Sequence, residues 1–293
     1  MFKGVYTALI TPFNKGGIDW DALGRLLDIQ IDAGIAGVVP CGTTGEAATL
    51  SHEEHRQVVR YCVDRVQKRI QVVAGTGSNA TQESIDLTRY ARDAGADGAL
   101  IITPYYNKPG QEGLFQHYSR IAESVDLPII LYNVPGRTAV DMTPDTVLRL
   151  SRIKGIVAIK EATGNMERAA VIHHRCGEAM TLLSGDDATF LPFLAVGGQG
   201  IISVTANIAP RHMVGVWKAW QQRDISLAIS RHEQLLDLNR ILFCETNPIP
   251  VKAAAAMLGM CSDDIRLPLT PLGKDNQTLV RDVIKAMGLF GSV

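Results

Sequence analysis

The chain has 293 residues, of which 46% are hydrophobic and 20% charged, and its formal net charge is -1. This hydrophobic fraction provides a large core and excludes a disordered chain. Because there is no basic excess to neutralise phosphates, the composition gives no indication of nucleic acid or an anionic membrane surface as a partner.

Cysteine usage and the N-terminus predict a cytoplasmic protein. The five cysteines form no CxxC pair, which is typical of a reduced compartment. The apolar stretch at residues 1–13 is broken by Pro12 and lacks the charged start of a secretory signal, so no signal peptide is expected. No apolar run approaches the ~18 residues of a membrane span.

Strand and helix patterns alternate along most of the chain. The predicted strands cover residues 5–11, 37–40, 71–74, 98–102, 128–132, 155–162, 181–184 and 200–203. The predicted helices cover residues 19–33, a segment opened by a Ser51/Glu54 capping box, and residues 81–94, 111–124, 144–151, 166–176, 188–195 and 210–220. A D-A-G-x-x-G pattern at residues 32–37 and 93–98 predicts the same tight helix-to-strand connection twice.

Eight strands, each followed by a helix, predict an α/β fold, a (β/α)8 TIM barrel, over residues 1–223. Residues 225–293 show helical periodicity and no convincing strand. We therefore expect a catalytic barrel at residues 1–223 and a C-terminal helical region at residues 224–293.

The predicted strand at residues 155–162 ends its apolar run on a lysine. Its small and branched residues do not alternate with polar ones, which is typical of a strand buried on both faces. Lys160 then has two interpretations. It marks where the strand reaches water, which is the commoner case for a lysine, or it is a partly desolvated amine that acts as a Schiff-base nucleophile.

Other polar residues follow the ends of neighbouring strands, where barrel enzymes place their active sites. Tyr132 ends the strand before that of Lys160, and a phenol beside an amine suits acid–base catalysis of imine formation. Glycines flank Thr43 and Thr44, so backbone amides there could approach a carboxylate. Arg137 could bind a second carboxylate through two parallel bonds. An ordinary glycine-rich loop and a surface arginine are the alternatives.

Two further patterns are weaker. Residues 75–80 match the G-x-G-x-x-A dinucleotide pattern, but the next strand has no acid at its end, so a nicotinamide oxidoreductase is not expected. Residues 52–55 are His-Glu-Glu-His, which is not the H-E-x-x-H zinc motif, so no metal site is expected.

Several motifs together resemble the dihydrodipicolinate synthase family along the whole chain. They are GTTGE at 42–46, TPYYN at 103–107, YNVPGRT at 132–138, IKEATGN at 159–165, LSGDD at 183–187 and NPIPVK at 247–252. Sister enzymes such as N-acetylneuraminate lyase share the lysine and the tyrosine. The position of Arg137 and the GTTGE form of the loop favour the synthase.

The resemblance implies that Lys160 forms an imine with pyruvate. It implies that Tyr132 relays protons and is linked through Thr43 to Tyr106, which in the family enters the neighbouring subunit's site. The resulting enamine attacks L-aspartate 4-semialdehyde to give 4-hydroxy-tetrahydrodipicolinate, the first committed step of lysine (diaminopimelate) biosynthesis. No metal or organic cofactor is implied, and the family assembly is a homotetramer, a dimer of dimers.

The resemblance also implies the substrate contacts. Thr44 and the loop amides hold the pyruvate carboxylate, and Arg137 meets the carboxylate of aspartate semialdehyde. Gly185 and Ile202 line the pocket. The alternatives are another pyruvate-dependent aldolase, and a non-catalytic barrel that only binds a keto acid.

Regulation by L-lysine is a further expectation from the resemblance. In lysine-inhibited members of the family, an allosteric pocket lies at the dimer interface. The matching residues here are His52, His55, Asn79, Glu83 and Tyr105. Ala47 departs from a relative that carries serine there. The alternative is two ordinary solvated helix faces.

Overall fold

A computed structural model describes residues 1–291. It has a closed barrel of parallel strands in the spatial order β1-β10-β9-β8-β7-β6-β5-β4. The barrel strands are β1 (Gly4–Ala8), β4 (Gly37–Val39), β5 (Gln71–Gly75), β6 (Gly98–Ile102), β7 (Ile129–Asn133), β8 (Ile156–Glu161), β9 (Thr181–Ser184) and β10 (Gly200–Ser203). The predicted TIM barrel is confirmed.

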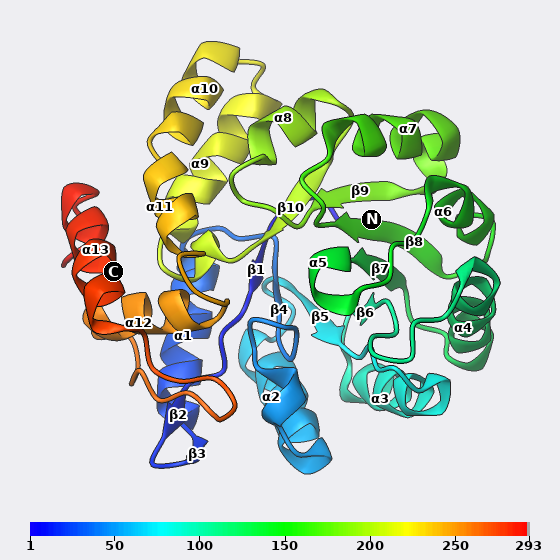
Figure 1. Cartoon of the computed structure of the whole chain (residues 1–293), viewed down its shortest axis with the longest axis horizontal. Coiled ribbons are helices and arrows are strands. Elements are labelled where there is room, and N and C mark those ends of the chain that lie inside the picture. The colour runs from blue at the N-terminus through cyan, green and yellow to red at the C-terminus, as the bar shows by residue number, and fades with distance from the viewer. Residues whose placement is uncertain (292–293) are drawn as a thin grey trace.

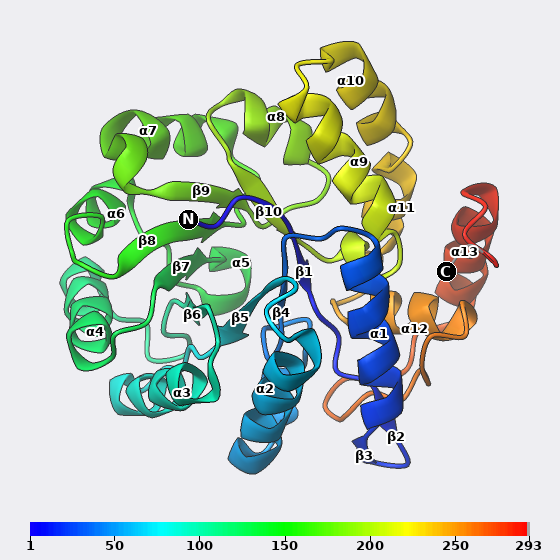
Figure 2. The same ribbon diagram turned by 180° about the vertical axis from the view of Figure 1, so that it is seen from behind.

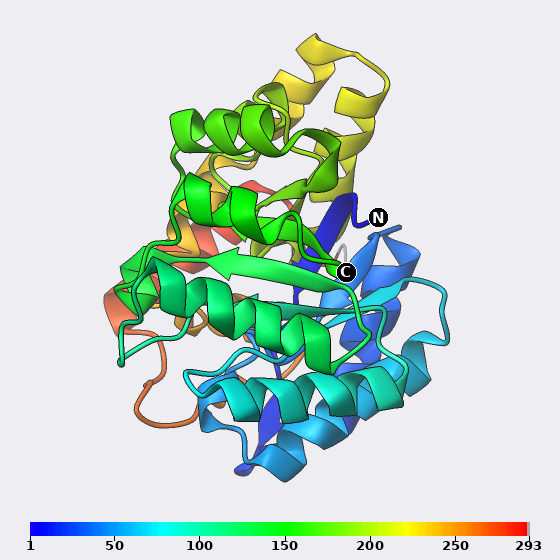
Figure 3. The ribbon, with the colours of Figure 1, turned by 90° about the vertical axis from the view of Figure 1, so that its right-hand side faces the viewer.

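Helices surround the strands (Figure 1). They are α1 (Trp20–Asp32), α2 (His52–Val66), α3 (Thr81–Ala94), α4 (Gln111–Ser124), α6 (Pro144–Leu150), α7 (Met166–Cys176), α8 (Phe190–Ala195) and α9 (Pro210–Gln221). Figure 3 shows the helices lying along the strands as an outer layer. Their caps follow the sequence: the Ser51/Glu54 capping box is present, and the Asp19 side chain accepts a hydrogen bond from the Ala22 amide at 2.9 Å.

Four further helices lie on one side of the barrel, beside α1 and α9 (Figures 1 and 2). They are α10 (Ile225–Glu233), α11 (Leu236–Ile241), α12 (Ile249–Met257) and α13 (Lys274–Ala286). No strand occurs after residue 224 within the described chain. The last two positions of the predicted helical region, Ser292 and Val293, lie outside the described residues. No described helix has the length and apolarity needed to cross a membrane.

Strand β7 buries apolar side chains on both of its faces. Ile130 and Tyr132 point into the barrel, where they pack with Leu183 and Ile202. The intervening Leu131 belongs to the larger core between strands and helices. The barrel interior is therefore a packed core. The side chains of the candidate site lie at the C-terminal ends of the strands, which we call the upper end of the barrel.

Two local elements were not predicted. Residues 5–11 were expected to form one strand, but β1 ends at Ala8 and a short hairpin follows, β2 (Phe13–Asn14) and β3 (Gly17–Ile18). Its turn places Lys15 and Gly16 at positive φ, a conformation that glycine favours. The second element is α5 (Pro135–Thr138), a single turn that Pro135 opens at a position where its missing N–H costs nothing.

Candidate active site

A lysine and a tyrosine meet at the upper end of the barrel. Lys160 on β8 lies opposite Tyr132 on β7, and the Lys160 Nζ is 4.4 Å from the centre of the Tyr132 ring. Both residues are buried: Lys160 is 6% exposed and Tyr132 is 7% exposed. The strand therefore does not carry Lys160 into water. The arrangement gives a partly desolvated amine beside a phenol, a pair suited to imine chemistry.

A polar network fixes the ends of these two strands from the other side. Asn133 and Glu161 directly follow the tyrosine and the lysine, and the Asn133 amide donates to the Glu161 carboxylate at 3.2 Å. The Arg168 Nε donates to the same carboxylate at 2.8 Å. Glu161 is 2% exposed, and Arg168 supplies the opposite charge beside it. This network was not predicted from the sequence. The only sign of it was a polar residue directly after each of the two strand-end residues, Asn133 after Tyr132 and Glu161 after Lys160.

Gly185 and Ile202 lie next to the lysine and the tyrosine, respectively. A Cβ at Gly185 would lie 3.0 Å from the Lys160 Cε, so the lysine side chain passes directly over this glycine. Ile202 is buried in the barrel interior in the same cluster as Tyr132. The prediction that they line the pocket is not met, because neither is among the described residues that line the cavity at this end of the barrel.

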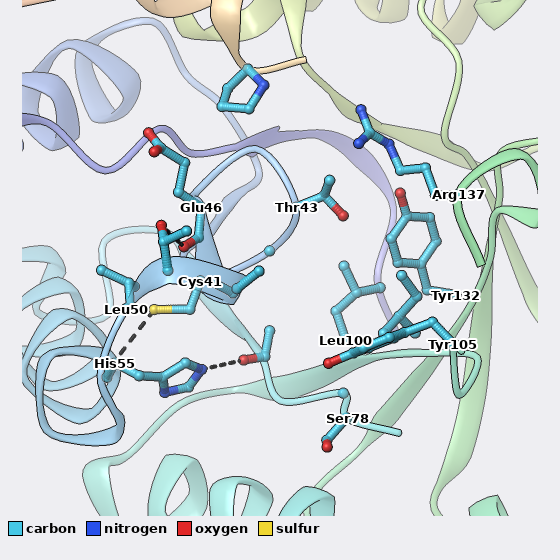
Figure 4. Close-up of a pocket in the computed structure, with 18 of the residues that line it drawn as sticks. Cys41, Thr43, Glu46, Leu50, His55, Ser78, Leu100, Tyr105, Tyr132 and Arg137 are labelled. Atoms are coloured by element: carbon cyan, nitrogen blue, oxygen red, sulfur yellow. Dashed lines mark hydrogen bonds between the residues drawn. The ribbon is translucent and has the colours of Figure 1, made fainter. Parts of the chain in front are cut away.

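The cavity at this end of the barrel has a volume of about 530 Å³. Its wall includes Thr43 from the loop after β4, together with Tyr132 and Arg137 (Figure 4). In Figure 4 the Thr43 hydroxyl, the Tyr132 phenol and the Arg137 guanidinium lie around the same space. The size suits a small polar substrate, and the groups offer donors for anionic oxygens.

A residue of the C-terminal region joins the two predicted carboxylate contacts. The Asn247 Nδ2 donates to the Thr44 hydroxyl at 2.9 Å, and the Asn247 carbonyl accepts a hydrogen bond from Arg137 at 3.0 Å. Thr44 is 3% exposed, whereas Arg137 on α5 reaches solvent. From the sequence, Asn247 was noted only as the first residue of the NPIPVK motif. Its bridging role depends on a contact 203 residues distant in sequence.

Tyr106 does not join the other predicted catalytic residues within one chain. It is 90% exposed, lies outside the cavity wall, and adopts φ 71°, which is unusual for a residue other than glycine. Most of this large aromatic side chain is therefore in solvent in this protomer.

Known proteins resemble this chain over nearly its whole length. The dihydrodipicolinate synthetase family profile matches residues 1–287. A 4-hydroxy-tetrahydrodipicolinate synthase from Magnetococcus marinus is 62% identical over 290 residues, which cover 99% of both chains.

The chain belongs to the dihydrodipicolinate synthetase family.

Solved structures of this family match the whole fold. The chloride-inhibited dihydrodipicolinate synthase from Acinetobacter baumannii, solved in complex with pyruvate, superposes with a TM-score of 0.97 at 47% identity and covers 99% of this chain and 100% of its own. The enzyme from Cyanidioschyzon merolae, solved with lysine bound, superposes with a TM-score of 0.95 at 37% identity and covers 98% and 99%.

In this family member the G-x-G-x-x-A pattern has a packing origin. A Cβ at Gly75 would lie 2.2 Å from the Cys41 carbonyl oxygen, and one at Gly77 would lie 2.4 Å from the Ile102 nitrogen. Both glycines let backbone segments meet at the rim of the barrel, which is a reason for the pattern unrelated to nucleotides. Among residues 1–291, no group of three or more histidine, cysteine or acidic side chains is placed to hold a metal ion.

The predicted lysine-binding residues occupy the far wall of the same cavity. His52, His55, Glu83 and Tyr105 line it, whereas Asn79 does not. The His52 Nε2 lies 3.1 Å from the Glu83 carboxylate, which Ser78 also contacts. His55 is buried and its Nε2 lies 2.7 Å from the Gly75 carbonyl oxygen, so it is not part of a solvated face.

Two pKa values in this wall are displaced. Burial lowers the pKa of His55, so its imidazole is favoured in the neutral form. Burial, with a smaller effect of the Glu83 charge, raises the pKa of the Tyr105 phenol. The wall therefore places the Glu83 carboxylate near the neutral His55 imidazole and the neutral Tyr105 phenol, a composition that suits a ligand carrying an ammonium group.

Proposed function

We propose that the chain is a lyase that condenses pyruvate with L-aspartate 4-semialdehyde to give 4-hydroxy-tetrahydrodipicolinate, the first committed step of lysine (diaminopimelate) biosynthesis. The observation that carries the proposal is the buried Lys160 amine over the Tyr132 ring at the upper end of the barrel. Two enzymes named for this reaction are 62% and 52% identical to this chain over nearly its whole length, which supports the proposal.

The chemistry follows from the amine. Lys160 Nζ attacks the keto carbon of pyruvate, and loss of water leaves an imine that withdraws electrons from the methyl group. Loss of a methyl proton gives an enamine, whose carbon attacks the aldehyde of the second substrate. The amino group of that substrate then displaces Lys160 and closes the ring. Tyr132 receives and returns the protons, with Thr43 as its neighbour in the relay.

The two carboxylates require separate donors. In our proposal Thr44 and the amides of residues 42–46 hold the pyruvate carboxylate, and Arg137 binds that of aspartate semialdehyde. Asn247 contacts both Thr44 and Arg137, which supports a fixed spacing between the two substrates. Gly185 and Ile202 shape the floor beneath the imine.

Tyr106 has its proposed role in a second subunit. Its exposed side chain and positive φ support insertion of the phenol into a partner's site, where it would extend the proton relay from Thr43. We therefore propose a tight dimer as the catalytic unit, and two dimers as the tetramer.

The remaining proposals concern organisation and location. We propose residues 1–223 as the catalytic barrel and residues 224–293 as a helical region that supports its rim. The five cysteines are unpaired, and three of them are buried, which is consistent with a reduced cytoplasmic setting.

Borohydride trapping tests the central step. Reduction in the presence of pyruvate should convert the imine into a stable secondary amine on the peptide containing Lys160, detected by mass spectrometry. The control variant Lys160→Arg, which keeps the charge but cannot form the imine, should remain unmodified. An adduct on another lysine, or none in the wild type, would contradict the proposal.

We further propose that L-lysine inhibits the enzyme by binding at the wall formed by His52, His55, Glu83 and Tyr105, with Asn79 nearby. The Glu83 carboxylate supplies the counter-charge for the α-amino group. Tyr105 is adjacent to Tyr106 in the chain, so a ligand on Tyr105 can alter the position of the phenol in the relay.

Steady-state turnover against free L-lysine tests this site. We expect inhibition of the wild type at millimolar lysine and its loss in Glu83→Ala, because the counter-charge for the α-amino group is removed. Glu53→Ala is the matched control, since Glu53 is an exposed acid on α2 whose carboxylate accepts a hydrogen bond from Gln57. No inhibition of the wild type would reject the site, and unchanged inhibition in Glu83→Ala would place it elsewhere.

A further inference from the structure

The loop between β4 and α2 is held in a strained conformation. Cys41 has φ 55° and Glu46 has φ 54°, values that residues other than glycine rarely adopt. Between them, Gly45 packs so tightly that a Cβ would lie 3.0 Å from both the Cys41 nitrogen and the Leu9 carbonyl oxygen. Contacts from elsewhere in the fold must therefore maintain this conformation.

A buried ion pair from the C-terminal region provides such a contact. The Lys252 Nζ on α12 lies 2.6 Å from the Glu46 Oε1, and the two residues are 1% and 4% exposed. The other oxygen, Oε2, accepts a hydrogen bond from the Arg266 amide at 3.2 Å. The ammonium also lies 4.2 Å from the centre of the Phe13 ring. The Glu46 carboxylate is thus fixed from two sides.

The same segment contacts the loop a second time. Asn247, five positions before Lys252, donates to the Thr44 hydroxyl at 2.9 Å. Residues 44 and 46, at the end of the proposed pyruvate-carboxylate loop, are therefore both bound by residues 247–252.

The chemistry of the pair indicates a purpose other than stability. Burial lowers the pKa of Lys252, and the Glu46 charge opposes that effect, so the ammonium depends on its partner. Replacing such a pair by uncharged groups of similar size is often neutral or stabilising for folding, whereas removing one partner is strongly destabilising. We therefore assign this ion pair to holding the loop in its conformation rather than to stabilising the folded state.

We propose that Lys252 is a positioning residue for pyruvate: through Glu46 it holds the amides and hydroxyls of residues 43–44 in the orientation that binds the carboxylate. The inference rests on the proposed function of this loop. It predicts that the barrel folds without the pair but binds pyruvate poorly.

The test compares the wild type with the double variant Glu46→Gln/Lys252→Met, which removes both charges and retains their volumes. We expect a melting temperature close to that of the wild type. The pyruvate concentration that half-saturates borohydride trapping at Lys160 should rise about tenfold, the equivalent of one misplaced charge-assisted contact. The KM for aspartate semialdehyde should change much less.

Lys68→Met is the matched control. Lys68 pairs with Asp97 at 2.9 Å, but on the opposite, N-terminal face of the barrel, so its loss should leave the pyruvate dependence unchanged. A folded double variant with wild-type pyruvate dependence would overturn the proposal. Equal rises for both substrates, or a double variant recovered only unfolded, would assign the pair to the fold and overturn it as well. Absence of trapping in the wild type would instead reject the proposed reaction.

Discussion

Tyr132→Phe is expected to fold normally and to lose roughly 10²–10⁴-fold in turnover, the usual contribution of a positioned acid–base group. The ring keeps its packing in the barrel interior and beneath the Lys160 amine, so only the proton-carrying hydroxyl is removed. Steady-state kinetics together with a thermal melt monitored by circular dichroism would measure both quantities.

Tyr118→Phe provides the matched control for that loss. Tyr118 is fully buried on α4, and its hydroxyl donates to the Ile101 carbonyl at 3.1 Å, away from the cavity. This variant should lose about 1 kcal/mol of unfolding free energy and keep its turnover. Turnover near the wild-type value in folded Tyr132→Phe would refute the proton relay.

Arg137→Ala is expected to raise the KM for aspartate semialdehyde by roughly 10–100-fold, because a hydrogen bond to a charged group contributes about 1.5–3 kcal/mol. The KM for pyruvate should change far less, since the proposed pyruvate donors lie on the loop after β4. Initial rates with each substrate varied in turn separate the two effects.

Two variants sharpen the assignment of Arg137. Arg137→Lys keeps the charge without the planar fork, and should give an intermediate KM for the semialdehyde. Arg149→Ala removes an arginine that pairs with Glu112 at 2.7 Å on the helical layer, and should leave both KM values unaltered. Equal increases for both substrates in Arg137→Ala would show that its bond to Asn247 is structural.

The periodic parts of the fold were predictable because each depends on local sequence. An apolar run without alternation marked residues 155–162 as a strand buried on both faces, and the helix start at Ser51 followed from its own capping residues. The same reasoning placed Tyr132 beside Lys160, since consecutive strands of a barrel are neighbours.

The contacts that complete the site were not predictable, because they join distant segments. Asn247 reaches Thr44 across 203 positions, and Lys252 reaches Glu46 across 206. Lys252 lies in the alanine-rich α12, which indicates a buried lysine that needs an acidic partner. No sequence pattern identified Glu46 as that partner. The hairpin after β1 and the single turn of α5 were missed for a different reason, since both are too short to show periodicity.

Gly185 limits how this barrel can be redesigned. A methyl group at that position would stand 2.5 Å from the Ala162 Cβ and 3.0 Å from the Lys160 Cε, so even alanine would displace Ala162 and crowd the lysine that we propose as the nucleophile. A mutant library aimed at new aldehyde acceptors should therefore keep glycine at 185. It should place its diversity at cavity positions to which we assign no role, such as Leu50, Thr246 and Leu269.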